Sequence, residues 1–337
     1  MDHRSRLDLI SDLQSKIHRS LAGYIREDQH LSIVDFPDIK NCGDSAIWVG
    51  EIAYLRRHFN GKTPDYVSRL RDYAPSDLRR KAPDGPIFIH GGGNFGDIWL
   101  AHQTFRERVL ADFPDRQVVQ FPQSIHFNDP RHIDAAARAI DRHGNFILLV
   151  RDAESLEFSR KHFNCEVRLC PDMAFAIGPI EWSRRALPVL AMLREDSEKV
   201  TRAGGWPFPD IPKEDWITED EALVTRTKRI AWAGSFRDLR PAERRFRMLD
   251  AAANQRLFDR GIAQIGRADA LVTDRLHVHI CALLLGRPHA VLDNSYGKIR
   301  RFMGAFSGGT DVAYRASSIR DGVAWAREQA ALAQAVV

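Results

Sequence analysis

The segment from residue 270 to residue 277 holds the residue types best suited to chemistry. An apolar run at 270–273 is followed by Asp274, Arg275, Leu276 and His277. The run predicts a buried strand that ends where a helix begins, and the free N–H groups of a helix start attract anions. Arg275 adds a planar fork that can grip a carboxylate or phosphate. We therefore predict an anion site at Arg275 and Leu276, beside His277, which is either a catalytic acid or a packed core histidine.

Further positive charge follows other apolar runs. Arg151 comes directly after the run at 146–150, Arg194 follows a run that ends at 193, and Lys298 follows the run at 288–292. Arg151 is either an anion ligand or the ion-pair partner of a nearby aspartate, Asp152 or Asp172. We expect Arg151, Arg194 and Lys298 to add to the anion site.

Polar residues also gather after the first predicted strands. Asp44 lies in the segment 41–47, just before a predicted helix, and either caps that helix or contacts a substrate, since Ser45 could cap instead. Consecutive glycines at 91–93 would let a ligand approach the backbone closely. We expect the acceptor side of a site here, made by Asp44 and by the loop residues Gly92, Gly93, Asn94, Gln123 and Ser124.

The glycine segment also excludes two classes of protein. It has neither the G-x-G-x-x-G spacing of dinucleotide-binding folds nor the G-K-[ST] ending of a P-loop. The four cysteines form no C-x-x-C pair and stand at no zinc-ligand spacing with histidine. We expect neither a bound cofactor nor a metal.

Alternating apolar runs and helical patterns must position these residues. Strands are predicted at 32–34, 86–90, 117–121, 146–150 and 167–170, with helices at 45–59, 98–113, 130–143 and 153–163. A second series has strands at 188–193, 229–232, 270–273 and 288–292 and helices at 241–265, 276–285 and 296–305. The stretch 194–220 has no clean periodicity and reads as a long connection. Strands that alternate with helices indicate parallel sheets covered on both faces.

The predicted fold class is α/β, with two doubly wound Rossmann-like domains facing each other across a cleft. The domains span 30–180, on the acceptor side, and 187–310, on the donor side, and a C-terminal helix follows at 316–333. Ligands of such sheets bind at the carboxyl ends of the strands. The cleft is therefore the predicted site.

The composition and the N-terminal segment limit the classes of partner that the protein can have. The chain has 337 residues and a net charge of +4, too small to demand a nucleic-acid partner. No apolar run of transmembrane length and no signal peptide is visible, so a cytoplasmic protein is expected. Residues 1–29 predict an amphipathic helix with apolar residues at helical spacing, which packs on its own domain or contacts the inner face of the membrane.

Eight motifs together resemble the polysaccharide pyruvyl transferase family in order and spacing. They cover residues 40–305 and read NCGDSAI, HGGGNFGDIW, FPQS, RDAES, CPDMAF, LRED, TDRLHVHI and NSYGKI. Each motif is weak alone, whereas eight in register are specific. The resemblance implies a GT-B-like fold, phosphoenolpyruvate as donor, and a ketal-linked pyruvate on a sugar of a surface polysaccharide or of its lipid-linked precursor.

Carried over by position, the family's donor-binding arginines fall on Arg275 and Arg151, and its proposed general acid falls on His277. Val278 departs from the small residue of many members, which puts local packing in doubt. Two alternatives stay open: a GT-B glycosyltransferase that uses a nucleotide sugar, and a non-catalytic subunit of a polysaccharide assembly complex. The sequence specifies neither the acceptor sugar nor the oligomeric state.

Overall fold

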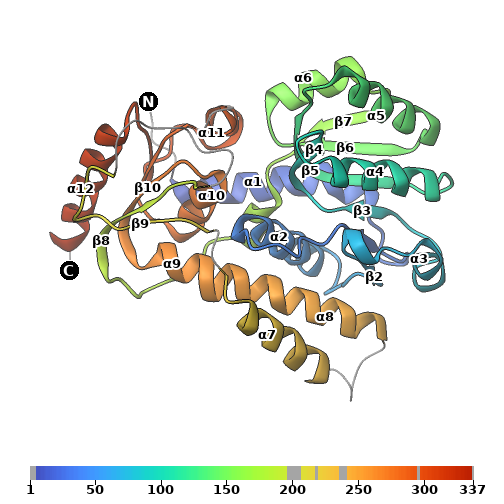
Figure 1. Ribbon diagram of the computed structural model, residues 1–337, viewed down its shortest axis with the longest axis horizontal. Helices are drawn as coiled ribbons and strands as arrows, with labels where there is room; N and C mark the ends of the chain where they lie inside the picture. Colours follow the sequence, from blue (N-terminus) through green and yellow to red (C-terminus); the bar gives the residue numbers. More distant parts are fainter. Residues whose placement is uncertain (1–4, 196–205, 217–218, 235–240, 294–296, 336–337) are drawn as a thin grey trace.

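The computed structural model describes residues 5–195, 206–216, 219–234, 241–293 and 297–335. The side chains of residues 241, 242 and 298 also lie outside the described part. Within it, strands alternate with helices and form two parallel sheets (Figure 1). The fold is α/β, as the sequence predicted.

The first sheet contains seven strands within the described residues, in the order β2-β1-β3-β5-β6-β7, with β4 paired to β5. Strands β1, β3 and β6 are buried along their whole length, and β6 is a run of five apolar residues. Such runs are typical of parallel strands covered on both faces. The strands are β1 (Ser32–Val34), β2 (Tyr66–Val67), β3 (Ile87–Ile89), β4 (Gly92–Gly96), β5 (Val118–His126), β6 (Phe146–Val150) and β7 (Glu166–Leu169).

The helices around this sheet begin and end at residues suited to those positions. Asp129 caps α5 by accepting a hydrogen bond from the Arg131 N–H at 2.9 Å, and Gly144 ends that helix in the left-handed conformation. The helices are α1 (Arg6–Leu21), α2 (Cys42–His58), α3 (Pro75–Lys81), α4 (Leu100–Asp112), α5 (Pro130–His143) and α6 (Ala153–His162), with short 3₁₀ turns η1 (Ala22–Tyr24), η2 (Leu70–Asp72) and η3 (Met173–Ile177).

The second sheet has five strands within the described residues, in the order β12-β11-β10-β8-β9. Its strands are β8 (Leu187–Met192), β9 (Lys213–Glu214), β10 (Ala268–Thr273), β11 (His289–Val291) and β12 (Ala313–Arg315). The helices of this part are α9 (Ala263–Gly266), α10 (Leu276–Leu285), α11 (Lys298–Phe302), the π-helix η5 (Met303–Ser307) and α12 (Ile319–Ala335). The predicted C-terminal helix is α12, and it packs on β8, β10 and β11.

The strand predicted at 229–232 is wrong, because these residues belong to helix α7 (Glu221–Gly234). Asp220 starts this helix by accepting hydrogen bonds from the N–H groups of Ala222 and Leu223, both at 3.0 Å. A four-residue apolar run does not by itself distinguish a strand from a turn of helix.

A long helical segment follows α7 and matches the helix predicted at 241–265. It consists of α8 (Pro241–Asn254), the π-helix η4 (Gln255–Ile262) and α9. Although this segment leads into the second sheet, α8 packs against α2 and β2 of the first part (Figure 1). The helices between the two sheets thus join them on one side.

The apolar stripe of α1 is inside the protein except for Leu7, which is exposed. Leu9, Ile10, Leu13, Ile17 and Leu21 are each at most 1% exposed and belong to the core cluster that also contains residues of α2 and α10. Packing on its own chain is therefore the use of this stripe, and these side chains are not available to a membrane. No described helix is both long enough and apolar enough to span a bilayer.

Candidate active site

A cleft of about 610 Å³ opens at the carboxyl ends of strands from both sheets. Its lining includes Asp35 after β1, His90 after β3, Arg151 after β6, Arg194 after β8 and Arg275 after β10. Ligands of open parallel sheets bind at this edge because loops and helix N-termini meet there. The position predicted for the site coincides with this cleft.

The structure brings most of the predicted site residues together. The lining includes Asp44, Gly93, Asn94, Arg151, Arg194, Arg275, Leu276 and His277. Gln123 and Ser124 contact lining residues instead, and Gly92 lies next to Asp44. The side chain of Lys298 lies outside the described residues.

Arg151, Asp172 and His277 form one buried cluster. Arg151 Nη1 donates to Asp172 at 2.5 Å, and His277 Nε2 lies 3.4 Å from the same Asp172 oxygen and 3.5 Å from Arg151 Nη1. Arg151 Nε also donates to Ser124 Oγ at 3.0 Å. Burial opposes ionisation of Asp172, but the charge of Arg151 and the contact with His277 hold the pKa of this carboxyl well below its usual range. Asp172 thus fixes an arginine and a histidine in the wall of the cleft.

Arg275 has a carboxylate partner that the sequence did not suggest. Its Nε and Nη2 atoms pair with the two oxygens of Asp215, which lies in the long connection before α7. The Arg275 N–H donates to Thr273 Oγ1 at 3.0 Å, which fixes the bend from β10 into α10. Both side chains of the pair are at most 6% exposed. An anion in the cleft would therefore share each of these arginines with an internal carboxylate.

Gly43 is needed for the close approach of α2 to α10. A Cβ atom at residue 43 would lie 2.3 Å from Nδ1 and 2.6 Å from Cγ of His277. No side chain fits in that space, so the first turn of α2 packs directly on the imidazole ring. Steric exclusion by His277 thus explains why residue 43 of the NCGDSAI motif is glycine.

The predicted capping role is wrong, because neither Asp44 nor Ser45 caps α2. The N-cap is Asn41, whose Oδ1 accepts from the Gly43 N–H at 3.1 Å. The Asn41 amide also donates to Asp44 Oδ2 at 2.8 Å. Asp44 is consequently left in the first turn, facing the cleft.

The glycine segment is a strand, β4, where the sequence suggested a loop. Gln123 holds it to β5, since its Oε1 accepts from the Asn94 N–H at 3.1 Å and its Nε2 donates to Asn94 Oδ1 at 2.9 Å. Gly92 has φ +132, a conformation that favours glycine. Gln123 is fully buried and acts on the site by positioning Asn94.

The sequence did not predict two histidine–carboxylate pairs in the part of the chain that contains the first sheet. His102 Nδ1 lies 2.8 Å from Asp35, and His90 Nδ1 lies 2.9 Å from Glu51. Burial raises the pKa of Glu51. It also disfavours a charged His90, yet the Glu51 carboxylate raises the pKa of that histidine. The sequence signal was the position of Asp35 and His90 directly after apolar runs.

Asp38 forms ion pairs with four basic side chains at the rim of the cleft. Its carboxylate accepts ion pairs from Arg69 at 2.9 Å, Arg71 at 3.1 Å, Lys228 at 2.6 Å and Arg256 at 3.2 Å. Burial opposes its ionisation, but the bonds from Lys228 and Arg69 hold the pKa of Asp38 well below the usual range. The loop after β1 is thereby fixed to η2, α7 and η4.

Comparison with known proteins shows the family. The model of the polysaccharide pyruvyl transferase family matches residues 41–296. Pyruvyl transferase 1 of Schizosaccharomyces pombe is 31% identical over 300 residues, which cover 83% of this chain and 70% of that protein. EpsO of Bacillus subtilis, named as a candidate pyruvyl transferase, is 27% identical over 286 residues, or 82% of this chain and 85% of EpsO. The chain belongs to the polysaccharide pyruvyl transferase family, and its activity is pyruvyl transfer.

A solved structure shares the fold. An uncharacterised protein of Klebsiella pneumoniae superposes with a TM-score of 0.53 at 17% identity, covering 94% of this chain and 99% of that one. At this identity the likeness concerns the fold alone.

Proposed function

We propose that the protein takes pyruvate from phosphoenolpyruvate and attaches it as a ketal to a sugar of a surface polysaccharide or of its lipid-linked precursor. The observation that carries this proposal is the gathering of Arg151, Arg194 and Arg275 around His277 in one cleft. Phosphoenolpyruvate has about three negative charges, because a phosphate contributes up to two and the carboxylate adds one. Three guanidinium groups at strand ends can bind such an anion, although Arg151 and Arg275 would share it with the carboxylates that they already contact.

In this proposal His277 donates a proton to the methylene carbon of phosphoenolpyruvate. The central carbon then becomes electrophilic, a sugar hydroxyl attacks it, phosphate leaves, and a second hydroxyl closes the ketal. Asp172 and Gly43 fix the imidazole from two sides, through the 3.4 Å contact at Nε2 and the packing at Nδ1. Asp44 faces the cleft and would orient the acceptor.

The architecture proposed with this activity is GT-B-like, with Rossmann-like domains at 30–180 and 187–310 facing each other across the cleft. The first would hold the acceptor and the second the donor. The parallel order of both sheets and a lining drawn from both support it. We propose a cytoplasmic location, and any contact with the membrane would use a surface other than the buried stripe of α1.

The test is incubation with phosphoenolpyruvate and a panel of synthetic or lipid-linked oligosaccharides. We expect an acceptor with the added mass of a pyruvate ketal and one phosphate released per ketal. Transfer from a nucleotide sugar, with phosphoenolpyruvate left intact, would overturn the proposal. Because arginines supply the positive charge, activity should survive EDTA, and a loss that magnesium restores would favour the nucleotide-sugar reaction.

A further inference from the structure

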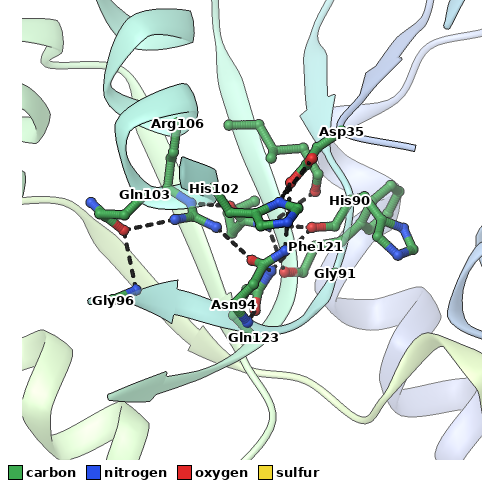
Figure 2. Close-up of polar contacts among 12 residues, drawn as sticks. Asp35, His90, Gly91, Asn94, Gly96, His102, Gln103, Arg106, Phe121 and Gln123 are labelled. Carbon is green, nitrogen blue, oxygen red and sulfur yellow. Dashed lines mark hydrogen bonds and ion pairs between the residues drawn. The ribbon is translucent and has the colours of Figure 1, made fainter. Parts of the chain in front are cut away.

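Asp35 and His102 form an unassigned pair in the acceptor half of the cleft (Figure 2). His102 Nδ1 lies 2.8 and 3.0 Å from the two carboxylate oxygens of Asp35. Asp35 directly follows β1 and has φ +67. This left-handed conformation is uncommon outside glycine and concentrates at functional sites. The chain thus keeps an unfavourable backbone conformation at the residue that holds His102.

His102 and Asp35 differ in exposure. A general base must reach the ligand, whereas the residue that positions it can be buried. The Asp35 side chain is 1% exposed, whereas that of His102 is 30% exposed and lines the cleft. A carboxylate at Nδ1 keeps the proton on that nitrogen and leaves a lone pair on Nε2. Nε2 of His102 has no hydrogen-bond partner among the residues that the structure describes.

A network of amides supports this pair (Figure 2). Asn94 Nδ2 reaches Asp35 at 3.5 Å, and Asn94 Oδ1 accepts from Gln123 at 2.9 Å and from Arg106 Nη2 at 2.9 Å. Arg106 also donates to two further glutamines, at 2.6 and 2.7 Å. Asn94 is therefore held from three directions and cannot turn away from Asp35.

Arg106 supplies a fixed charge to the network. It is 1% exposed and lies over the Phe95 ring, with its guanidinium carbon 4.2 Å from the ring centroid. Burial lowers the pKa of Arg106 to about 10, and the charge of Asp35 opposes that shift. Arg106 donates its hydrogen bonds to neutral amides, and the nearby carboxylates of Asp35 and Glu107 favour its charged form.

From these contacts we propose that His102 is the general base that takes the proton of the attacking acceptor hydroxyl, and that Asp35 positions it. The inference rests on the proposed pyruvyl transfer from phosphoenolpyruvate. The hydroxyl proton moves to Nε2, and the oxygen forms a bond to the central carbon of the donor. The electron pair of the donor's double bond takes the proton of His277, which completes the methyl group. The bond to phosphate then breaks, and its electron pair leaves with the phosphate.

Two other groups in the same half are less suited to this step. His90 is 2% exposed, and its Nε2 is buried without a partner among the described residues, so a sugar hydroxyl would have to displace the wall to reach it. Asp44 already accepts the Asn41 amide at 2.8 Å. Among the three, His102 alone combines a fixed nitrogen with a free one at the cleft.

The test compares wild type, His102→Gln, His102→Ala and Asp35→Asn, with the best acceptor from a panel of 4-nitrophenyl hexosides. A matched control is His30→Gln, because His30 lies 2.8 Å from Asp84 in a similar pair outside the cleft. We expect His102→Gln to lower kcat by about 10²–10⁴, with calorimetric affinity for phosphoenolpyruvate unchanged. Added imidazole should restore part of the rate of His102→Ala, and Asp35→Asn should also lower kcat. His30→Gln should match wild type.

Three results would overturn the base. A higher KM for the acceptor at unchanged kcat would make His102 a binding residue only. A lowered Tm with normal kcat per folded molecule would make the pair structural. Failure of imidazole to restore any activity to a folded His102→Ala would also contradict proton transfer. A wild-type protein that transfers no pyruvate to any acceptor would instead contradict the proposed function, and the base role with it.

Discussion

His277 and His102 line the same cleft, each beside an aspartate, yet their surroundings differ. His277 is 13% exposed and has Arg151 at 3.5 Å, so its aspartate is shared with a guanidinium group. His102 is 30% exposed, and the nearest cation of its network, Arg106, acts through Asn94. The first arrangement suits an anionic donor and the second a neutral sugar. In the proposed reaction, the pair with an arginine beside it would act on the donor, and the pair without an adjacent arginine would act on the acceptor.

The largest expected effect is on the donor side. His277→Gln should lower turnover by about 10²–10⁴, the usual contribution of a general acid, while donor affinity and Tm stay close to wild type. Turnover and thermal melting would be measured on the same preparations. A lowered Tm with retained turnover would make His277 a packed core residue and break the comparison.

Removing each aspartate should separate the two pairs by stability. Asp172→Asn leaves Arg151 buried without its carboxylate, and breaking a buried pair in this way costs about 3–5 kcal/mol. Asp35→Asn should cost less, because its direct partner His102 is partly exposed and the buried Arg106 keeps its hydrogen bonds to amides. Urea unfolding of both variants measures the difference. Equal losses of unfolding free energy in the two variants would mean that the contact of Asp172 with Arg151 adds no stability beyond that of the Asp35–His102 pair.

Arg275→Lys tests whether the planar guanidinium group of Arg275 is needed to bind the donor. Lysine keeps the charge but cannot bond both a ligand and the two oxygens of Asp215 in one plane. Affinity for phosphoenolpyruvate should fall by about 1.5–3 kcal/mol, the range for hydrogen bonds to charged groups, as measured by calorimetry. Arg71→Lys is the control, since that side chain lies on the cleft rim and is 68% exposed. If the two variants bind alike, Arg275 does not hold the donor.

A smaller effect concerns the acid stability of the part that contains the second sheet. His279 and His289 are fully buried, 2.7 Å apart, and burial lowers the pKa of His289 to about 4. Between pH 6.5 and 4 the unfolded chain therefore binds more protons than the folded one, so stability falls as the pH drops through this window. Melting curves from pH 7 to 4 should show a Tm that falls continuously through this window. The pH dependence should shrink in His289→Gln, and an unchanged dependence would remove His289 as its cause.

The sequence predicted the strands that lead to site residues because the apolar runs of these strands are continuous. The runs before Arg151 and Arg275 are strands β6 and β10, and both arginines reach the cleft. The run at 229–232 is as long as the run at 270–273, but it begins with the charged Arg229 and lies in α7, where Val224 is buried. Uninterrupted apolar composition, rather than length, separated the two outcomes.

The partners of the site residues could not be predicted. Asp215 lies 60 residues before Arg275, and Asp35 lies 67 residues before His102. Such pairs depend on how the sheets are ordered, which local patterns do not encode. The left-handed backbone of Asp35 leaves no trace either, because such a conformation is normally signalled by glycine. From the sequence alone, His102 is one residue of the helix predicted at 98–113.

The central claim is that the donor is protonated on its methylene carbon before the ketal forms, and a reaction in D₂O tests it most directly. If His277 delivers a proton that exchanges with solvent, the methyl group of the ketal should carry one deuterium, visible by NMR and by mass. Wild type should give this product in step with phosphate release, and folded His277→Gln should give it at least about a hundredfold more slowly. A product that keeps its vinyl carbon, or a methyl group without deuterium, would contradict the account.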